Sequence, residues 1–329
     1  MVELAFDRGT IPLAVPAELV PHSVASPPID QPMATLIEGD NLSALEALVE
    51  EGRRFELIYL DPPFFTQRTH HRKKKARRRD GAVVPDKSTA FDDRWASLDA
   101  YLGHLWARLE RIRALLSEDG SVVLHVDPTT SHYLKVVCDT LFGRGAFASE
   151  IIWRYRRWPA KTRNFQRVHD VLLRYVRDPR VTPRFRQLYE PLAPSTLATW
   201  GNAKQRAVVD AEGRRRRSSK TDDASPGTPM GDVWDIGVVA PVARERTGYP
   251  TQKPEALLRR IVTALSREGD AVLDPYVGSG TTLAVTAALG RTGVGIDKSP
   301  EAIAVTRERL REAGIHVAEP RLVVRPSPK

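Results

Sequence analysis

The stretch FELIYLDPPF, residues 55–64, decides the fold of this chain. Its apolar residues Leu57–Leu60 follow one another with no polar residue between them, which is typical of a strand buried on both faces of a sheet. The two prolines have no N–H to donate, so they end the strand and oppose a helix. The sequence therefore predicts a rigid, extended tetrapeptide, Asp61–Phe64, at the carboxyl end of a central strand, where open α/β sheets bind their ligands.

This tetrapeptide suits chemistry on the exocyclic amine of a nucleobase, which is a poor nucleophile because its lone pair is delocalised into the ring. Asp61 can accept one N–H of the amine, and the Pro62 carbonyl, held in direction by Pro62 and Pro63, can accept the other. Two such acceptors localise the lone pair for in-line attack, and Phe64 gives an extruded base a flat face for stacking. On these four residues alone, a plain strand-ending turn is an equally good interpretation.

Length and composition restrict the class of protein. A chain of 329 residues forms one large domain or one domain with an insertion, and its formal net charge of +9 favours a polyanionic partner. The single cysteine, Cys138, lies in an apolar helical pattern and is interpreted as core filling; one cysteine excludes a disulfide framework and a cysteine zinc cluster, and no metal site is predicted. With no signal-type segment and no run near the roughly 18 apolar residues of a membrane span, we expect a soluble, cytoplasmic protein with no membrane partner.

Strand and helix patterns alternate after a proline-rich start. Residues 1–33 are expected to be an arm laid over the domain, or partly disordered. Asp40, just before the first helical pattern, suits a helix cap and a ligand contact equally well. The predicted elements are a strand at 34–38, a helix from 42, the strand 55–60, a helix at 98–116, a strand at 121–126, a helix at 132–142 and strands at 150–155 and 171–176.

A run of basic residues follows the tetrapeptide. Residues 66–90 lack apolar periodicity, and such charge runs are usually solvated loops. We expect a mobile loop that is disordered when free and clamps phosphates when nucleic acid binds. The candidate phosphate contacts are Arg72, Lys73, Lys74, Lys75, Arg77, Arg78 and Arg79.

Regular patterning is lost over residues 179–245. A segment of this length without predicted elements is usually functional, and basic residues interleaved with aromatic ones suit contact with nucleic acid. Its candidate contacts are Arg214, Arg215, Arg216 and Arg217, and a disordered insertion is the alternative. A shorter basic segment, with Arg156, Arg157, Lys161, Arg163 and Arg167, joins the strands predicted at 150–155 and 171–176.

A second site is predicted near the carboxyl end of the chain. Residues 271–297 contain a strand, a glycine turn, a helix starting near Thr281 and a second strand closed by Asp297. Gly278 and Gly280 allow backbone to approach a ligand, the helix N-terminus directs N–H groups toward it, and Asp297 is placed to accept ribose hydroxyls.

This glycine turn differs from two common nucleotide motifs. A P-loop requires Gly-Lys-Ser/Thr, and no lysine is present here. A dinucleotide site wants a third glycine, where Leu283 stands. A ligand with adenosine but no pyrophosphate fits better. S-adenosylmethionine is such a ligand, and an activated amine attacks its sulfonium methyl group.

Taken together, the two sites resemble the amino-methyltransferases of DNA in their permuted β arrangement, in which the catalytic tetrapeptide precedes the target-recognition region and the cofactor turn follows it. The resemblance covers residues 34–178 and 246–312. The quoted motifs are Asp274-Pro275-Tyr276-Val277-Gly278-Ser279-Gly280, with Tyr276 where the family usually has Phe, and Thr251-Gln252-Lys253-Pro254, Gly39-Asp40, Leu124-His125-Val126-Asp127 and His169-Asp170.

The resemblance implies a fold, a cofactor and a set of site residues. The fold is a doubly wound mixed α/β sheet of the S-adenosylmethionine-dependent, Rossmann-like type: residues 34–178 and 246–316 form the catalytic domain, 179–245 the inserted target-recognition region and 317–329 a tail. His169-Asp170 falls in the segment that lines the base pocket, with His169 as a nucleic-acid contact. The cofactor contacts implied are Asp40, Asn41, Asp61, Thr251, Lys253, Asp274, Tyr276, Gly278, Ser279, Gly280, Thr281, Thr282 and Asp297.

The resemblance also implies a substrate. Asp as first residue of the tetrapeptide usually accompanies adenine N6, so Asp61 favours adenine in double-stranded DNA, with cytosine N4 as the alternative. An RNA amine methyltransferase and a non-catalytic DNA-binding subunit are less favoured. A homodimer and a restriction endonuclease of the same system are the partners left open.

Overall fold

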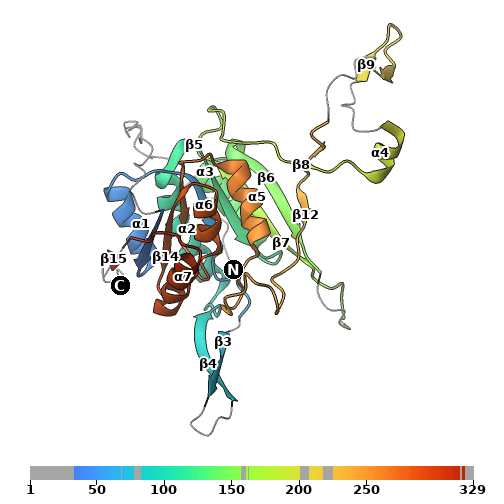
Figure 1. Ribbon diagram of the computed structural model, residues 1–329. Helices are drawn as coiled ribbons and strands as arrows, with labels where there is room; N and C mark the ends of the chain where they lie inside the picture. Colours follow the sequence, from blue (N-terminus) through green and yellow to red (C-terminus); the bar gives the residue numbers. More distant parts are fainter. Residues whose placement is uncertain are drawn as a thin grey trace.

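The computed structural model describes most of the chain (Figure 1). The described residues are 33–67, 69–77, 83–156, 161, 163–200, 207–217, 225–318 and 321–322. Only the backbone is described at 69–77, 83–92, 199–200, 207, 215–217 and 321–322. The arm expected at 1–33 lies outside the described residues except for its last one.

One mixed sheet of nine strands forms the centre of the molecule. Its strands are β1 (Ala34–Glu38), β2 (Phe55–Leu60), β5 (Leu116–Val126), β6 (Phe147–Arg154), β7 (His169–Val176), β12 (Val233–Asp235), β13 (Ala271–Asp274), β14 (Thr292–Asp297) and β15 (Arg321–Leu322). They lie in the order β12-β6-β7-β5-β2-β13-β14-β1-β15. Only β7 is reversed, antiparallel to both β5 and β6, so the expected mixed sheet is confirmed.

Helices cover both faces of this sheet (Figure 1). One face carries α1 (Asn41–Glu50), α2 (Leu98–Leu115), α3 (Ser131–Phe142) and the short 3-10 helix η1 (Arg144–Ala146), and the other carries α5 (Glu255–Leu265), α6 (Thr281–Ala288) and α7 (Pro300–Glu312). In β2, Ile58 and Leu60 pack in the first layer while Leu57 and Tyr59 pack in the second. The strand is therefore buried on both faces, as its uninterrupted apolar run predicts. Cys138 fills the core under α3, which confirms its interpretation.

The order of the strands brings the two predicted sites together. β2 and β13 are parallel neighbours, with Leu57 beside Val272 and Ile58 beside Leu273. The tetrapeptide after β2 and the glycine turn after β13 consequently leave the sheet at the same edge, although they lie far apart in the chain.

The basic segment after the tetrapeptide forms a hairpin, so the expectation of an irregular loop was wrong. β3 (Thr69–Arg77) pairs antiparallel with β4 (Val83–Asp92), with Lys74 opposite Asp86 in the register. In Figure 1 the hairpin projects away from the sheet. A two-stranded ribbon pairs the backbone groups that face the partner strand and leaves the others to water, so it forms without the apolar periodicity that a packed strand requires. Arg78 and Arg79 lie outside the described residues, and ordering on nucleic acid stays a prediction.

The candidate recognition region 179–245 divides into two parts. Its middle is an arm with β8 (Tyr189–Glu190), α4 (Pro194–Trp200), β9 (Ala207–Val209), β10 (Arg215–Arg217) and β11 (Thr228–Pro229), which reaches away from the sheet in Figure 1. Just before this arm, the Arg184 N–H donates to the Asp119 carbonyl near the start of β5, and the Arg186 N–H donates to the Ala264 carbonyl at the end of α5. The arm therefore leaves from the edge where the parallel strands begin, opposite the edge that carries the two sites.

Both edge strands of the sheet come from segments that the sequence analysis assigned outside the catalytic domain. β12, from the recognition region, pairs with β6, and β15, from the tail, pairs with β1. Val317 also bridges to Ala34. These additions cover edge strands whose backbone groups would otherwise lack partners. In the part of the chain that is described, no helix is long and apolar enough to cross a membrane.

Candidate active site

A cleft of about 1180 Å³ opens at the edge of the sheet where β2, β5, β13 and β14 end. Asp61–Phe64 line one side of it, and residues 274–279 of the glycine turn line another. The two predicted sites therefore share one cavity.

The two carboxylate oxygens of Asp61 have different surroundings. Oδ2 accepts a hydrogen bond from the ammonium group of Lys253, whose side chain is only 10% exposed. Oδ1 lies 3.9 Å from Nδ1 of His125, beyond hydrogen-bond distance. The Lys253 ammonium also lies 5.3 Å from the centroid of the Phe64 ring. A cation thus fixes one oxygen of Asp61, and the other is left to accept a ligand N–H.

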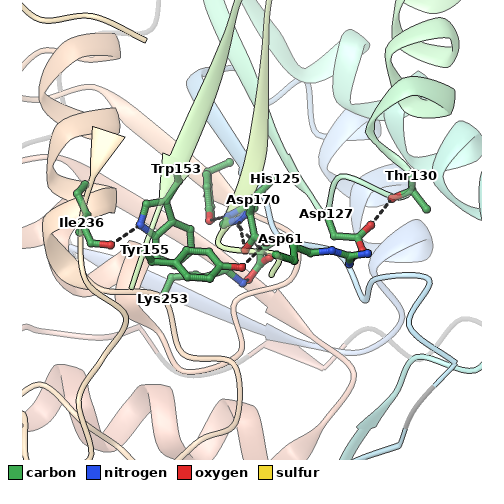
Figure 2. A network of polar contacts seen from close by, with 11 residues as sticks. Asp61, His125, Asp127, Thr130, Trp153, Tyr155, Asp170, Ile236 and Lys253 are labelled. Carbon is green, nitrogen blue, oxygen red and sulfur yellow. Dashed lines mark hydrogen bonds and ion pairs between the residues drawn. The ribbon is translucent and has the colours of Figure 1, made fainter. Parts of the chain in front are cut away.

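A buried polar network supports this carboxylate from within the sheet (Figure 2). His125 Nε2 lies 3.3 Å from Asp170 Oδ2, and the Tyr155 hydroxyl donates to Asp170 Oδ1 at 3.0 Å. Burial alone would raise the pKa of Asp170, but the hydrogen bond from His125, the positive charge of Lys253 and the hydrogen bond from Tyr155 hold that pKa below its usual value. Asp170 is therefore the ionised acceptor of this network.

Tyr59 is the partner of the other ring nitrogen of His125. Its oxygen lies 2.7 Å from His125 Nδ1, and burial beside several carboxylates raises the pKa of Tyr59 well above its usual value. A neutral Tyr59 hydroxyl can donate a hydrogen bond to Nδ1, and in that tautomer Nε2 carries the hydrogen that faces Asp170. Nδ1 then has no proton to donate to Asp61, which leaves Oδ1 free of competition from His125.

The wall of the cleft beyond Asp61 is aromatic. Trp153 and Tyr155 line it with ring centroids 4.9 Å apart, and the Trp153 Nε1–H donates to the Ile236 carbonyl at 2.8 Å. Sequence reasoning did not single out these two aromatics, although their i, i+2 spacing in a predicted strand puts them on one face. Of the predicted segment His169-Asp170, Asp170 lines the cleft and His169 does not, because successive strand residues face opposite sides. Contact of His169 with nucleic acid stays a prediction.

At the second site, Asp297 anchors the glycine turn. Its Oδ2 accepts the Gly278 N–H at 3.0 Å and its Oδ1 accepts the Ser299 N–H at 2.9 Å. Burial raises the pKa of Asp297 despite these hydrogen bonds. Gly278 has φ of +49°, which favours glycine. Asp297 and Gly278 both line the cleft, in agreement with their predicted place.

Gly280 has a different role from the one expected. Among the described residues it does not line the cleft, whereas Ser279, Thr281 and Thr282 do. A Cβ at Gly280 would lie 2.7 Å from a Thr306 side-chain carbon, and its φ is +74°. The glycine is required so that α7 can pack against the turn.

Comparison with known proteins agrees with this geometry. Residues 55–308, which include the tetrapeptide and the glycine turn, match the family of N6 and N4 methyltransferases described as DNA methylase. The chain belongs to this family. It is 28% identical over 286 residues to the DNA adenine methyltransferase YhdJ of Escherichia coli (strain K12), covering 87% of this chain and 85% of the relative. It is 30% identical over 278 residues to the type II methyltransferase M.HpaI of Haemophilus parainfluenzae, covering 84% of this chain and 73% of the relative.

Two solved structures share the fold of this DNA methylase. The crystal structure of the M1.HpyAVI–SAM complex matches with a TM-score of 0.51 at 17% identity, over 84% of this chain and 99% of that one. The cytosine-N4-specific PvuII DNA methyltransferase matches with a TM-score of 0.53 at 15% identity, over 84% and 88%. The expected methyltransferase fold is confirmed.

The far end of the DNA methylase cleft is formed where α1 begins. Asp40 caps α1 by accepting the Leu42 N–H at 3.0 Å, so the capping interpretation is confirmed, and its Oδ2 also pairs with Arg108 Nη2 at 3.1 Å. Asn41 donates to the Pro275 carbonyl at 2.9 Å and so ties α1 to the glycine turn. Asp40, Asn41 and Arg108 all line the cleft.

His104 closes this end of the cleft, and sequence reasoning missed both it and Arg108. Its Nε2 lies 3.1 Å from the Tyr276 hydroxyl, and its ring centroid is 4.8 Å from that of Trp95. Burial and the nearby Arg108 lower the pKa of His104 to about 4, so it is neutral near pH 7. His104 and Arg108 are four residues apart on α2, a spacing that marks one helix face but gives no sign of which face meets the cleft.

The remaining predicted residues are placed as follows. Thr251, Lys253, Asp274 and Tyr276 line the cleft. Lys253 was expected to contact the cofactor. In the structure its ammonium group donates to the carboxylate of Asp61. The exposed Arg214 and the backbone of Arg215–Arg217 belong to the arm at the opposite edge, so the fold does not bring them to the cleft. Within the described residues, no group of three or more His, Cys, Asp or Glu side chains is placed to hold a metal ion.

Proposed function

We propose that this DNA methylase transfers a methyl group from S-adenosylmethionine to the N6 amine of an adenine that is rotated out of double-stranded DNA. The observation that carries the proposal is the shared cleft: Asp61, with one oxygen available, and the glycine turn held by Asp297 face the same cavity. The amine acceptor and the adenosine-binding turn are thereby within one active site.

The residues at the glycine turn fit S-adenosylmethionine. The positive φ of Gly278 gives a ligand close access to backbone, and Asp297 lies at the tip of β14, where an acid accepts ribose hydroxyls. Asp40 and Asn41 would contact the adenine ring, and Thr251 and Lys253 lie toward the catalytic end. When bound, S-adenosylmethionine supplies an electrophilic methyl group on a sulfonium.

Catalysis rests on Asp61 and Pro62. Oδ1 of Asp61 and the Pro62 carbonyl each accept one N–H of the target amine, which localises its lone pair. The amine nitrogen then bonds the methyl carbon as the carbon–sulfur bond breaks, and Oδ1 of Asp61 is placed to take the proton that the nitrogen loses. Lys253 orients the carboxylate through Oδ2, and Phe64 stacks on the base.

Adenine is favoured over cytosine by the Asp61-type tetrapeptide and by the relative named as an adenine methyltransferase. We further propose that the enzyme acts in the cytoplasm, where its DNA and cofactor are found. The similarity to the type II methyltransferase M.HpaI supports a restriction endonuclease as functional partner. A homodimer stays a prediction, to be checked by light scattering.

The proposal is tested by transfer of labelled methyl from S-adenosylmethionine to unmethylated duplex DNA, followed by analysis of the nucleosides. We expect label in N6-methyladenine, and no label with Asp61→Asn although cofactor still binds. Label in N4-methylcytosine would keep the mechanism and reject the choice of base. Absence of label from DNA, with label entering RNA or nothing, would reject the proposed function.

A further inference from the structure

The loop between β6 and β7 forms a rim of the cleft that the catalytic mechanism does not use. Tyr155 at its start and Asp170 after its end both line the cleft, so the loop leaves and returns at the catalytic edge. Arg167, within the loop, also lines the cleft, and its Nη1 pairs with Asp127 Oδ2 at 2.9 Å. Asp127 is buried, and the Thr130 hydroxyl donates to it at 3.0 Å (Figure 2). The part of the loop that leads into β7 is thus anchored to the end of β5.

Two residues from that anchor, Phe165 is 99% exposed, the most exposed of the large hydrophobic side chains among the described residues. A phenylalanine in this position gains nothing from the protein core, because its whole ring faces solvent. The loop does not cover it: Phe165 follows a bend at residues 163–164, and Asn164 Oδ1 accepts the Phe165 N–H at 2.8 Å.

The neighbours of Phe165 are basic. Lys161 and Arg163 are exposed, and the Arg167 side chain is 47% exposed despite its ion pair. An exposed apolar ring in a basic segment does not suit a protein core or a neutral apolar partner. It suits the DNA duplex, whose phosphates attract the cations and whose stacked bases accept an apolar side chain between them.

We propose that Phe165 is a wedge that enters the duplex beside the target base and fills the gap left when that base rotates into the cleft. This inference rests on the proposed function, since it assumes a base extruded toward Asp61. Arg163 and Lys161 hold the flanking phosphates, and the ion pair between Arg167 and Asp127 sets the position of the loop relative to the cleft. Filling the gap recovers stacking that the extruded base gives up.

A wedge predicts a preference for DNA that is already open. We would measure Kd by fluorescence anisotropy, at one fixed salt concentration, for a fully paired duplex and for the same duplex with a central abasic site. Because unstacking a base step costs a few kcal/mol, the wild type should bind the abasic duplex at least about tenfold more tightly. Phe165→Ala should lose most of this preference, keeping only the part that comes from the missing base pair, and Phe165→Trp should keep it. Phe185→Ala is the matched control, since Phe185 is 55% exposed but belongs to the segment at the opposite edge.

The result that overturns the wedge is an unchanged preference for the abasic duplex in Phe165→Ala, or an equal reduction of that preference in Phe185→Ala. The same proteins are assayed for methyl transfer, which tests the proposed function separately. A wild type that prefers the abasic duplex through Phe165 but methylates no DNA would support the wedge and reject the proposed function. A wild type that methylates DNA but shows no preference for the abasic duplex would support the proposed function and reject the wedge.

Discussion

Replacing Asp274 by Asn would test whether burial controls the protonation of this carboxyl, which opens the cofactor turn. The Asp274 side chain is buried at the end of β13, with only 2% of the residue exposed. Burial raises its pKa from the ordinary 3.8 to about 7, and the nearby carboxylates of Asp61 and Asp297 add to the rise. Hydrogen bonds from Thr282 and from the Tyr276 N–H oppose that rise without cancelling it.

The sign of the effect follows from proton binding. Because the pKa is raised in the folded state, the folded protein binds more protons than the unfolded chain between pH 3.8 and about 7, and stability falls as pH rises through that window. A shift of about 3 pKa units corresponds to a loss of about 4 kcal/mol. Asparagine does not titrate, and its side-chain oxygen can still accept the Tyr276 N–H, which lies 2.9 Å from Oδ1 of Asp274. The variant should therefore gain up to about 4 kcal/mol on the wild type between about pH 4 and about pH 8.

Urea unfolding of both proteins across this pH range measures the difference directly. The free energy of unfolding of Asp274→Asn minus that of the wild type should rise with pH and level off above about 7. Glu312→Gln, which changes an exposed carboxyl, is the matched control and should show no such rise. A difference for Asp274→Asn that stays flat across the range would refute the reasoning that burial controls this carboxyl.

Three further predictions concern the cleft and the hairpin. Asp297→Ala should weaken S-adenosylmethionine binding about tenfold or more and leave DNA affinity unchanged, because it removes the acceptor of the Gly278 N–H; calorimetry that gave wild-type cofactor affinity would contradict this. Lys253→Met should lower kcat about 100-fold with a smaller change in KM for DNA and lose about 1–3 kcal/mol of stability, since Asp61, 18% exposed at its side chain, loses its cation. Equal kcat in the two proteins would remove Lys253 from catalysis. Changing the basic residues of 72–77 to Gln should reduce the slope of log K against log salt by about 0.9 for each phosphate that the hairpin no longer neutralises, and an unchanged slope would make the hairpin a solvated surface.

Local patterns determined much of the fold. The uninterrupted apolar run before Asp61 predicted a strand buried on both faces, and the structure packs Ile58 and Leu57 into opposite layers. The glycine turn was found from its two glycines between a predicted strand and a predicted helix, and the structure gives Gly278 the positive φ that favours glycine. The cap at Asp40 was found because helix N-termini require a nearby acceptor. Each of these depends on residues close together in sequence.

Some assignments failed because their physical cause is not local. β3 and β4 pair with each other across a ribbon and not with the packed sheet, so apolar periodicity did not reveal the hairpin. Arg214 looks suited to nucleic acid by composition. The hydrogen bonds of residues 184 and 186, however, hold the start of its arm at the sheet edge opposite the cleft. Gly280 was expected at a ligand, and only packing against Thr306 shows why glycine is needed there.

The sequence by itself determined which chemical groups this protein carries: an acid and two prolines closing a buried strand, and a glycine turn suited to adenosine. Only the tertiary structure decided that they act together. The parallel pairing of β2 with β13 places Asp61 and the glycine turn on one cleft, and the packing of α5 brings Lys253 to Asp61. Strand order and helix packing are set by burial over the whole core, so no pattern within a short stretch of the chain contains them.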